Sequence, residues 1–154
     1  MDSAAAWLQD QAARWSVSTA SANEVVLAAC DALVAGLDGP ALRALAACER
    51  AEADVDVPVL LPPALEEQGL TFYAFGSPEA SEAGVRLLAA HLLAGRLTPH
   101  ELTSQVHQRF GHELELAEHL SWLDDEYDLL DHTGRTADEV DAEVIAEARR
   151  VLGE

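Results

Sequence analysis

The stretch LTPHELTSQVHQRFGHELELAEHLSWLDDEYDLLDH, residues 97–132, decides the fold class of this protein. It opens with TPHE (98–101), which combines a helix-capping threonine, a proline at the first helical position and an acid three residues after the cap. Beyond this start, apolar residues recur at helical spacing through the segments 99–110 and 112–130. The sequence therefore predicts two consecutive amphipathic helices.

Similar signals extend outward on both sides of this stretch. Apolar residues recur at helical spacing over 4–15, 22–36, 40–53, 78–95 and 137–151, between capping residues and helix-ending glycines or prolines. No repeat of fixed period and no low-complexity linker divides the chain. We therefore predict an all-α fold, a single helical domain over residues 1–154 built as a bundle of six to eight helices.

One segment departs from this pattern. Pro58, Pro62 and Pro63 each lack a backbone N–H and restrict the residue before them. We therefore predict an irregular proline-rich crossover at about 55–76, with one helical turn at 63–68. At its end, LTFYAF (70–75) has the aromatic content of a β-strand. Because no second strand is visible to pair with it, the alternative that we favour is an aromatic lid packed over the helices.

The charge of the chain excludes several classes of function. Its 154 residues include 28 acidic and 9 basic ones, which gives a formal net charge of −19. Direct binding to nucleic acid or to an anionic membrane surface depends on cationic side chains, so we expect neither. All nine basic residues are arginine, which together with abundant alanine and leucine indicates a GC-rich bacterial genome.

The sequence also bears on localisation and redox state. The first residues, MDS, carry an acid where a signal peptide needs positive charge, and no apolar run approaches the roughly 18 residues of a membrane span. We therefore predict a cytoplasmic protein. Cys30 and Cys48 lack the spacing of a metal site, and we expect both to be reduced residues of the core.

The candidate partner-binding site is an acidic run. Residues 113–131 contain eight carboxylates and no arginine. We predict that this run binds a basic protein partner, with aromatic anchors inside a charged surface. Core packing is the competing expectation for Trp122, as for Trp7 and Trp15, because all three have the spacing of helix-face residues. The predicted partner-binding residues are Glu118, Trp122, Asp124, Asp125, Glu126, Tyr127, Asp128 and Asp131.

A second candidate site involves histidines. Five of the six histidines lie between residues 100 and 132, beside the acidic run. On a helix that begins at His112, the side chains of His112, Glu115 and His119 share one face. Imidazole and carboxylate suit zinc, iron or manganese, so these three are the candidate metal ligands, and no other cofactor is predicted. The alternative is a solvated polar helix face, since neither HExxH nor ExxH occurs in the chain.

The segments LTPHEL (97–102), His107, GH (111–112) and LDDEYD (123–128) resemble small acidic helical proteins of actinobacteria. That resemblance covers residues 97–140. Most proteins of this kind are uncharacterised and some resemble immunity proteins. The resemblance implies a cytoplasmic bacterial protein, and it assigns a role to no residue.

These observations together favour a protein without catalytic activity, because the chain has neither a GxSxG nucleophile motif nor a glycine-rich phosphate loop. The predicted function is that of an acidic interaction protein, which binds a basic partner as an immunity protein or an antitoxin does. Two alternatives stay open. One is a nucleic-acid mimic that occupies a DNA-binding protein, and the other is a metal-binding helical protein or metalloenzyme that uses histidine and carboxylate ligands.

Overall fold

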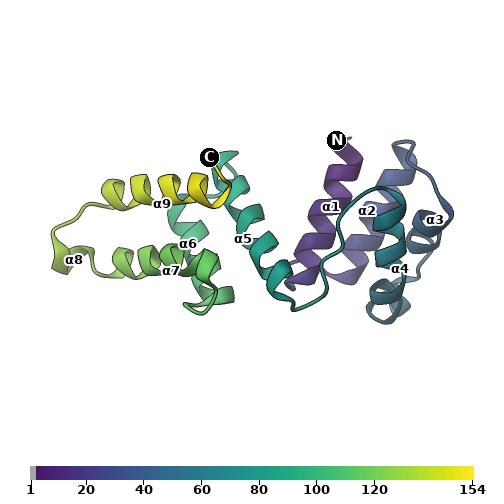
Figure 1. The fold of residues 1–154 in the computed structure, drawn as a ribbon, viewed down its shortest axis with the longest axis horizontal. Coiled ribbons are helices and arrows are strands. Elements are labelled where there is room, and N and C mark those ends of the chain that lie inside the picture. The colour runs from purple at the N-terminus through teal and green to yellow at the C-terminus, as the bar shows by residue number, and fades with distance from the viewer. Residues whose placement is uncertain (1–2) are drawn as a thin grey trace. The chain divides into compact units, whose positions relative to one another are not determined.

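The computed structural model describes residues 3–154, and every regular element among them is helical (Figure 1). Met1 and Asp2, on which part of the localisation prediction rests, lie outside the described residues. The all-α prediction is confirmed. No helix within residues 3–154 combines the length and the apolar character needed to cross a membrane. In chain order the elements are α1 (Ser3–Ser16), α2 (Ala22–Val34), α3 (Pro40–Ala46), the 3-10 helix η1 (Arg50–Glu52), α4 (Ala53–Glu67), α5 (Pro78–Leu93), α6 (Pro99–Phe110), α7 (Glu115–Asp128), α8 (Leu130–Thr133) and α9 (Ala137–Val151).

The chain divides into two compact units, residues 1–80 and residues 81–154. Each unit has a hydrophobic cluster of its own. That the whole chain acts as one domain stays a prediction.

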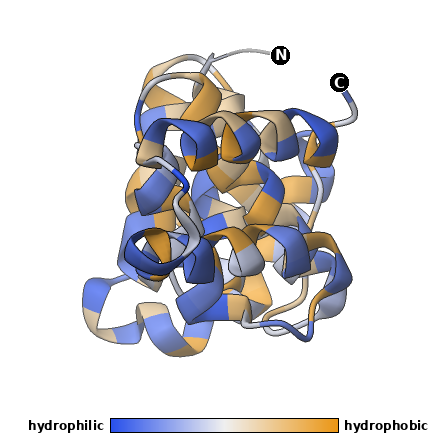
Figure 2. Ribbon diagram, turned by 90° about the vertical axis from the view of Figure 1, so that its left-hand side faces the viewer, coloured by the Kyte–Doolittle hydropathy of each residue, from blue (hydrophilic) through white to orange (hydrophobic). Residues whose placement is uncertain are grey.

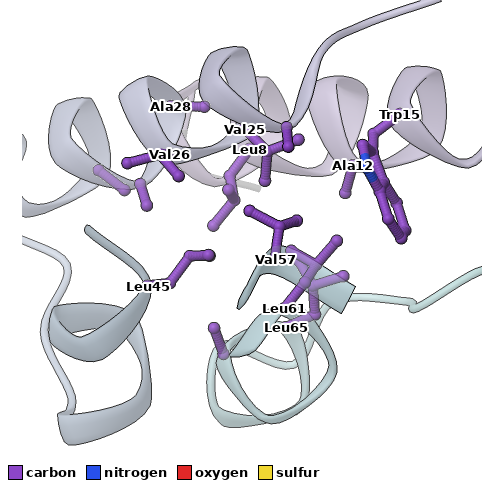
Figure 3. Packing of buried hydrophobic residues seen from close by; sticks show 14 of the residues in the cluster. Leu8, Ala12, Trp15, Val25, Val26, Ala28, Leu45, Val57, Leu61 and Leu65 are labelled. Carbon is purple, nitrogen blue, oxygen red and sulfur yellow. The ribbon is translucent and has the colours of Figure 1, made fainter. Parts of the chain in front are cut away.

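The first unit packs α2 against α1, α3 and α4. Side chains from several of these helices meet in one fully buried cluster, labelled in Figure 3, which includes Leu8, Val25, Val57, Leu61 and Leu65. At the start of α2, Ser21 and Glu24 form a capping box, in which each side chain accepts a hydrogen bond from the other residue's backbone N–H.

The prediction of an irregular crossover through the prolines is wrong. Residues 53–67 form the continuous helix α4, with Pro58, Pro62 and Pro63 inside it. The buried residues of α4 include Ala53, Val57, Leu61 and Leu65, which recur every fourth position, whereas Pro58 and Pro63 are exposed. Each proline leaves the carbonyl four residues before it without a helical donor. These carbonyls belong to Asp54, Pro58 and Val59, which are all exposed, so water can satisfy them. Burial of one apolar face outweighs the local cost of the prolines.

The irregular segment is shorter than predicted and spans residues 68–77, which contain no strand. The side-chain amide of Gln9 on α1 donates to the carbonyl of Thr71 and accepts from its N–H, at 2.8 and 2.7 Å. The ring of Phe75 packs on that of Trp15, with centroids 5.6 Å apart. This segment therefore contacts α1 through Thr71 and Phe75. Phe72 and Phe75 are nevertheless 37% and 60% exposed, so an aromatic lid packed over the helices stays a prediction.

The second unit places α7 alongside both α6 and α9 (Figure 1). Thr98 and Glu101 form the predicted capping box at the start of α6. Hydrophilic and hydrophobic stretches alternate along the helices in Figure 2, as expected where each helix buries one side. The fully buried residues of this cluster include Leu102, Val106, Leu120, Val140 and Val144.

Three local predictions are corrected by the structure. The first two concern helix bounds: α3 ends at Ala46 and not near 53, and α7 begins at Glu115 and not at 112. Gly111, with a φ of 58°, ends α6 and turns the chain, so residues 112–114 connect two separate helices. The third concerns tryptophan: Trp15 is buried as expected, but Trp7 and Trp122 are 46% and 59% exposed.

The two cysteines are free thiols at the edge of the first core and not inside it. Both are half-buried, and the thiol of Cys30 lies 3.4 Å from the carbonyl oxygen of Ala46. Partial burial, together with the carboxylate of Asp56, raises the pKa of the Cys48 thiol. Cys48 is therefore held as a neutral thiol, which is the poorly nucleophilic form.

Candidate functional site

Histidines and carboxylates face one another where α6 meets α7. His100 and His107 lie on α6, two turns apart, and Asp124 and Asp125 lie near the end of α7. His112 lies in the turn between the two helices. The hydroxyl of Ser121 on α7 donates to the carbonyl of Gly111 at 2.6 Å, which ties this turn to α7.

Asp124 is the inner carboxylate of this site, and its side chain is only 16% exposed. One oxygen, Oδ2, lies 2.9 Å from Nδ1 of His107, and the other, Oδ1, accepts from the hydroxyl of Thr103 at 3.1 Å. His100 Nε2 lies 3.7 Å from the same Oδ1. Asp124 therefore fixes the position of the His107 ring, because the carboxylate is itself held by α6.

Asp125 is the outer carboxylate and lies between two imidazoles. Its Oδ1 is 3.8 Å from His107 Nδ1, and its Oδ2 is 3.4 Å from His112 Nε2. The rings of His107 and His112 meet edge to face, with centroids 4.9 Å apart. One ligand atom from each of His107, His112 and Asp125 can be chosen so that all three lie within 4.8 Å of one another. Within residues 3–154 this is the one group of three or more metal-ligating side chains with that geometry.

Tyr127 connects the site to α9. Its ring stacks on that of His100, with centroids 4.2 Å apart, and its hydroxyl donates a hydrogen bond to Asp141 on α9. Burial, the hydrogen bond to Asp141 and the charges of Asp141 and Asp124 together raise the pKa of Tyr127. The phenol is therefore held in its neutral, hydrogen-donating form.

The acidic run is less free than the sequence predicts. Arg135, beyond the end of the run, reaches back so that its Nη1 lies 3.3 Å from a carboxylate oxygen of Glu126. The same guanidinium also pairs with Glu139 and Glu143 on α9. Of the predicted partner-binding residues, Asp124, Asp125, Glu126 and Tyr127 thus contact neighbours inside the second unit.

The other predicted partner-binding residues are exposed. Glu118 and Trp122 lie on the side of α7 that faces away from the core, and Asp128 and Asp131 lie near its end. We call the exposed residues on that side the outer face of α7; they are Glu115, Glu118, His119, Trp122 and Leu129.

The predicted metal ligands fall in two different places. Glu115 and His119 belong to the outer face of α7, whereas His112 precedes the helix and lies beside Asp125. The ligand group contains His107 and Asp125 with His112, and sequence reasoning missed the first two as ligands. Their approach depends on how α6 packs against α7, and a spacing rule within a single helix cannot show it.

The chain matches no protein-family model, no curated protein and no solved structure at a significant level. The resemblance of residues 97–140 to acidic helical proteins of actinobacteria therefore stays a prediction.

Proposed function

We propose that this protein is an acidic interaction module that binds a basic protein partner through the outer face of α7, as an immunity protein or antitoxin binds its toxin. The observation that carries the proposal is Trp122, whose side chain is 59% exposed on a regular helix. Tryptophan is enriched among the residues that contribute most of the binding energy in protein interfaces.

The surroundings of Trp122 favour a cationic partner. Glu118 lies one helical turn before it, and Glu115 two turns before it on the same side of α7. Leu129, 44% exposed, extends the apolar part of the face at the far end. An aromatic centre with a rim of carboxylates matches a partner surface that has an apolar pocket bordered by lysine or arginine.

The net charge supports the same conclusion about the partner. At −19, the chain attracts cationic proteins over a Debye length of roughly 8 Å at physiological salt. Such attraction raises the rate of association more than it raises affinity. We therefore expect the rate of complex formation to fall steeply with salt, whereas Trp122 governs how slowly the complex dissociates.

The test is an affinity capture from lysate of the host cell with four matched variants. Trp122→Ala and Glu118→Gln change the outer face of α7. Trp7→Ala and Glu66→Gln make the same changes at exposed positions of the first unit. We expect the wild type and the two controls, Trp7→Ala and Glu66→Gln, to capture the same basic protein. Trp122→Ala and Glu118→Gln should capture less of it. With the purified partner, Trp122→Ala should weaken binding by at least about 2 kcal/mol, roughly thirtyfold in Kd.

The result that contradicts the proposal is a partner bound equally well by Trp122→Ala, Glu118→Gln and the wild type. Loss of binding in the Trp7→Ala control instead would move the interface to α1. If double-stranded DNA displaces the captured partner, the protein acts as a nucleic-acid mimic on a DNA-binding protein.

A further inference from the structure

We propose that His107, His112 and Asp125 form a binding site for a divalent transition metal ion of the zinc class. The three residues come from α6, from the turn after it and from α7. The site borders the outer face of α7, because Asp125 lies one helical turn after Trp122, but it uses none of the residues of that face. It therefore does not depend on the proposed interaction with a basic partner.

The donor set is the first argument. Two imidazole nitrogens and one carboxylate oxygen are the ligand types that zinc and its neighbours in the first transition row prefer. A hard cation such as calcium takes six to eight oxygen ligands, which this group does not offer. Three protein ligands leave a fourth position for water or for a group supplied by a partner.

The distances are the second argument. Zinc binds histidine nitrogen and carboxylate oxygen at about 2.0–2.2 Å, so two ligands of a tetrahedral site lie roughly 3.3–3.5 Å apart. His112 Nε2 and Asp125 Oδ2 already lie 3.4 Å apart, and all three ligand atoms lie within 4.8 Å of one another. His112 and Asp125 have side chains 43% and 49% exposed, so both can move the remaining distance without disturbing the core.

The support for His107 is the third argument. Asp124, 16% exposed, lies against Nδ1 of His107 and is held in turn by the hydroxyl of Thr103. Metal-binding histidines in proteins ordinarily have such a carboxylate or carbonyl partner, which orients the ring. Because Asp124 occupies Nδ1, the His107 nitrogen left for the metal is Nε2, and we assign Asp124 as a positioning residue that fixes the ring for binding through that atom.

The competing explanation is that Asp125 forms simple ion pairs with protonated histidines. Such pairs at a solvent-exposed site add little to stability, and they would need no third partner. A metal titration separates the two explanations, because only a metal site binds one equivalent of Zn²⁺ through both imidazoles.

The experiment titrates Zn²⁺ into the full-length, untagged, chelator-treated protein and measures heat by calorimetry. We expect one saturable site per chain. His112→Ala and Asp125→Asn should each lower the affinity more than tenfold, and Asp124→Asn should lower it about 10–100-fold with the fold unchanged. His119→Ala is the matched control, because His119 is exposed on α7 but lies outside the ligand group; its affinity should equal that of the wild type.

Nitrogen-15 NMR of the histidine rings gives an independent readout. Zn²⁺ should shift the ring nitrogens of His107 and His112 and leave those of His119 and His132 unchanged. The proposal is overturned if no one-to-one binding occurs, or if His119→Ala weakens binding as much as His112→Ala does. Trp122→Ala should bind Zn²⁺ normally, so failure of the metal site and failure of the partner interface are distinguishable.

Discussion

At the scale of single residues, Glu67 makes a contact that no local sequence pattern predicts. Its carboxylate, at the end of α4, accepts hydrogen bonds from the backbone N–H groups of Ala41 and Leu42 at 3.1 and 3.0 Å. It thereby caps α3, whose own N-cap, Gly39, has no side chain to do so. A Cβ atom at Gly39 would lie 2.1 Å from that carboxylate. The glycine therefore makes room for a cap supplied from 28 residues away.

We expect Glu67→Ala to lower the midpoint of urea unfolding at neutral pH, and Glu66→Ala, at the exposed neighbouring position, to leave it unchanged. Burial opposes ionisation of Glu67, but the backbone hydrogen bonds from Ala41 and Leu42 outweigh it and lower its pKa below the usual 4.5. A lowered pKa in the folded state stabilises the fold above the unfolded-state pKa, and this contribution is lost as the pH falls through the folded-state value. The difference in the midpoint of urea unfolding between the wild type and Glu67→Ala should therefore become smaller at acidic pH. An equal difference at pH 7 and at low pH would contradict this.

Tyr127 supplies a second test, with the opposite dependence on pH. Tyr127→Phe keeps the ring that stacks on His100 but removes the hydroxyl that donates to Asp141. A partly exposed hydrogen bond to a charged group is worth about 1 kcal/mol, so we expect a loss of that size in the free energy of unfolding at pH 7. Because the folded-state pKa of Tyr127 is raised above 10.0, the contribution is complete below pH 10 and is lost above it.

Urea unfolding at pH 7 and at several values above pH 10 measures this effect, with Tyr73→Phe in the first unit as the control for loss of a phenol. We expect the curves of the wild type and Tyr127→Phe to converge in strong alkali. If Tyr127→Phe is as stable as the wild type at pH 7, the hydrogen bond from Tyr127 to Asp141 contributes no more to stability than the hydrogen bonds that these groups make with water in the unfolded chain.

At the scale of elements, α4 shows a helix formed against its local preferences. Proline in a helix interior costs about 3 kcal/mol relative to alanine, and α4 has three such residues. The cost is tolerated because the apolar line that includes Val57, Leu61 and Leu65 is fully buried in the first core. The packing of one face thus decides the state of the whole segment.

We therefore expect Pro58→Ala to raise the free energy of unfolding by roughly 1–2 kcal/mol. The restored N–H can form its helical hydrogen bond, which stabilises the folded state. This gain exceeds the loss that comes from the greater conformational entropy of the unfolded chain without proline. Pro40→Ala is the matched control, because Pro40 occupies the first turn of α3, where proline is favourable, and its removal should not stabilise the protein. Chemical denaturation of both variants checks this. A destabilised Pro58→Ala variant would mean that the core needs the bend that proline imposes.

At the scale of the whole molecule, repulsion among like charges opposes folding. The chain has 28 acids and only 9 arginines, so acids outnumber the available cationic side chains about threefold. Several of the available arginines are already paired, as Arg135 is with three glutamates and Arg150 with Glu147. Screening by salt weakens the repulsion and the ion pairs alike, but the repulsive contacts are more numerous.

Added sodium chloride should therefore raise the midpoint of urea unfolding at pH 7 up to about 0.5 M, where screening is largely complete. A midpoint that falls with salt would show that the paired arginines outweigh the unpaired acids. In the same series on Arg135→Gln, the ion pairs of Arg135 are absent, so the midpoint should rise more steeply with salt than that of the wild type.

Much of the fold and part of the site follow from the sequence alone. The capping boxes at Ser21 and Thr98, the helix-ending turn at Gly111 and the apolar lines of α6 and α9 are local patterns, and they specify helices without knowledge of what packs against them. For the same reason the sequence could locate histidines and acids in one stretch, and could mark Trp122 and Glu118 as surface candidates.

The tertiary structure alone decided which of those residues meet. It formed α4 through three prolines, brought Glu67 to the start of α3, and placed His112 in the turn before α7, beside His107 and Asp125. It also paired Glu126 with Arg135, which sequence counting treats as lying outside the acidic run. The physical reason is one of range. Capping and periodicity act within about one or two turns of a helix, whereas packing energy and charge pairing depend on distances across helices that no local pattern encodes.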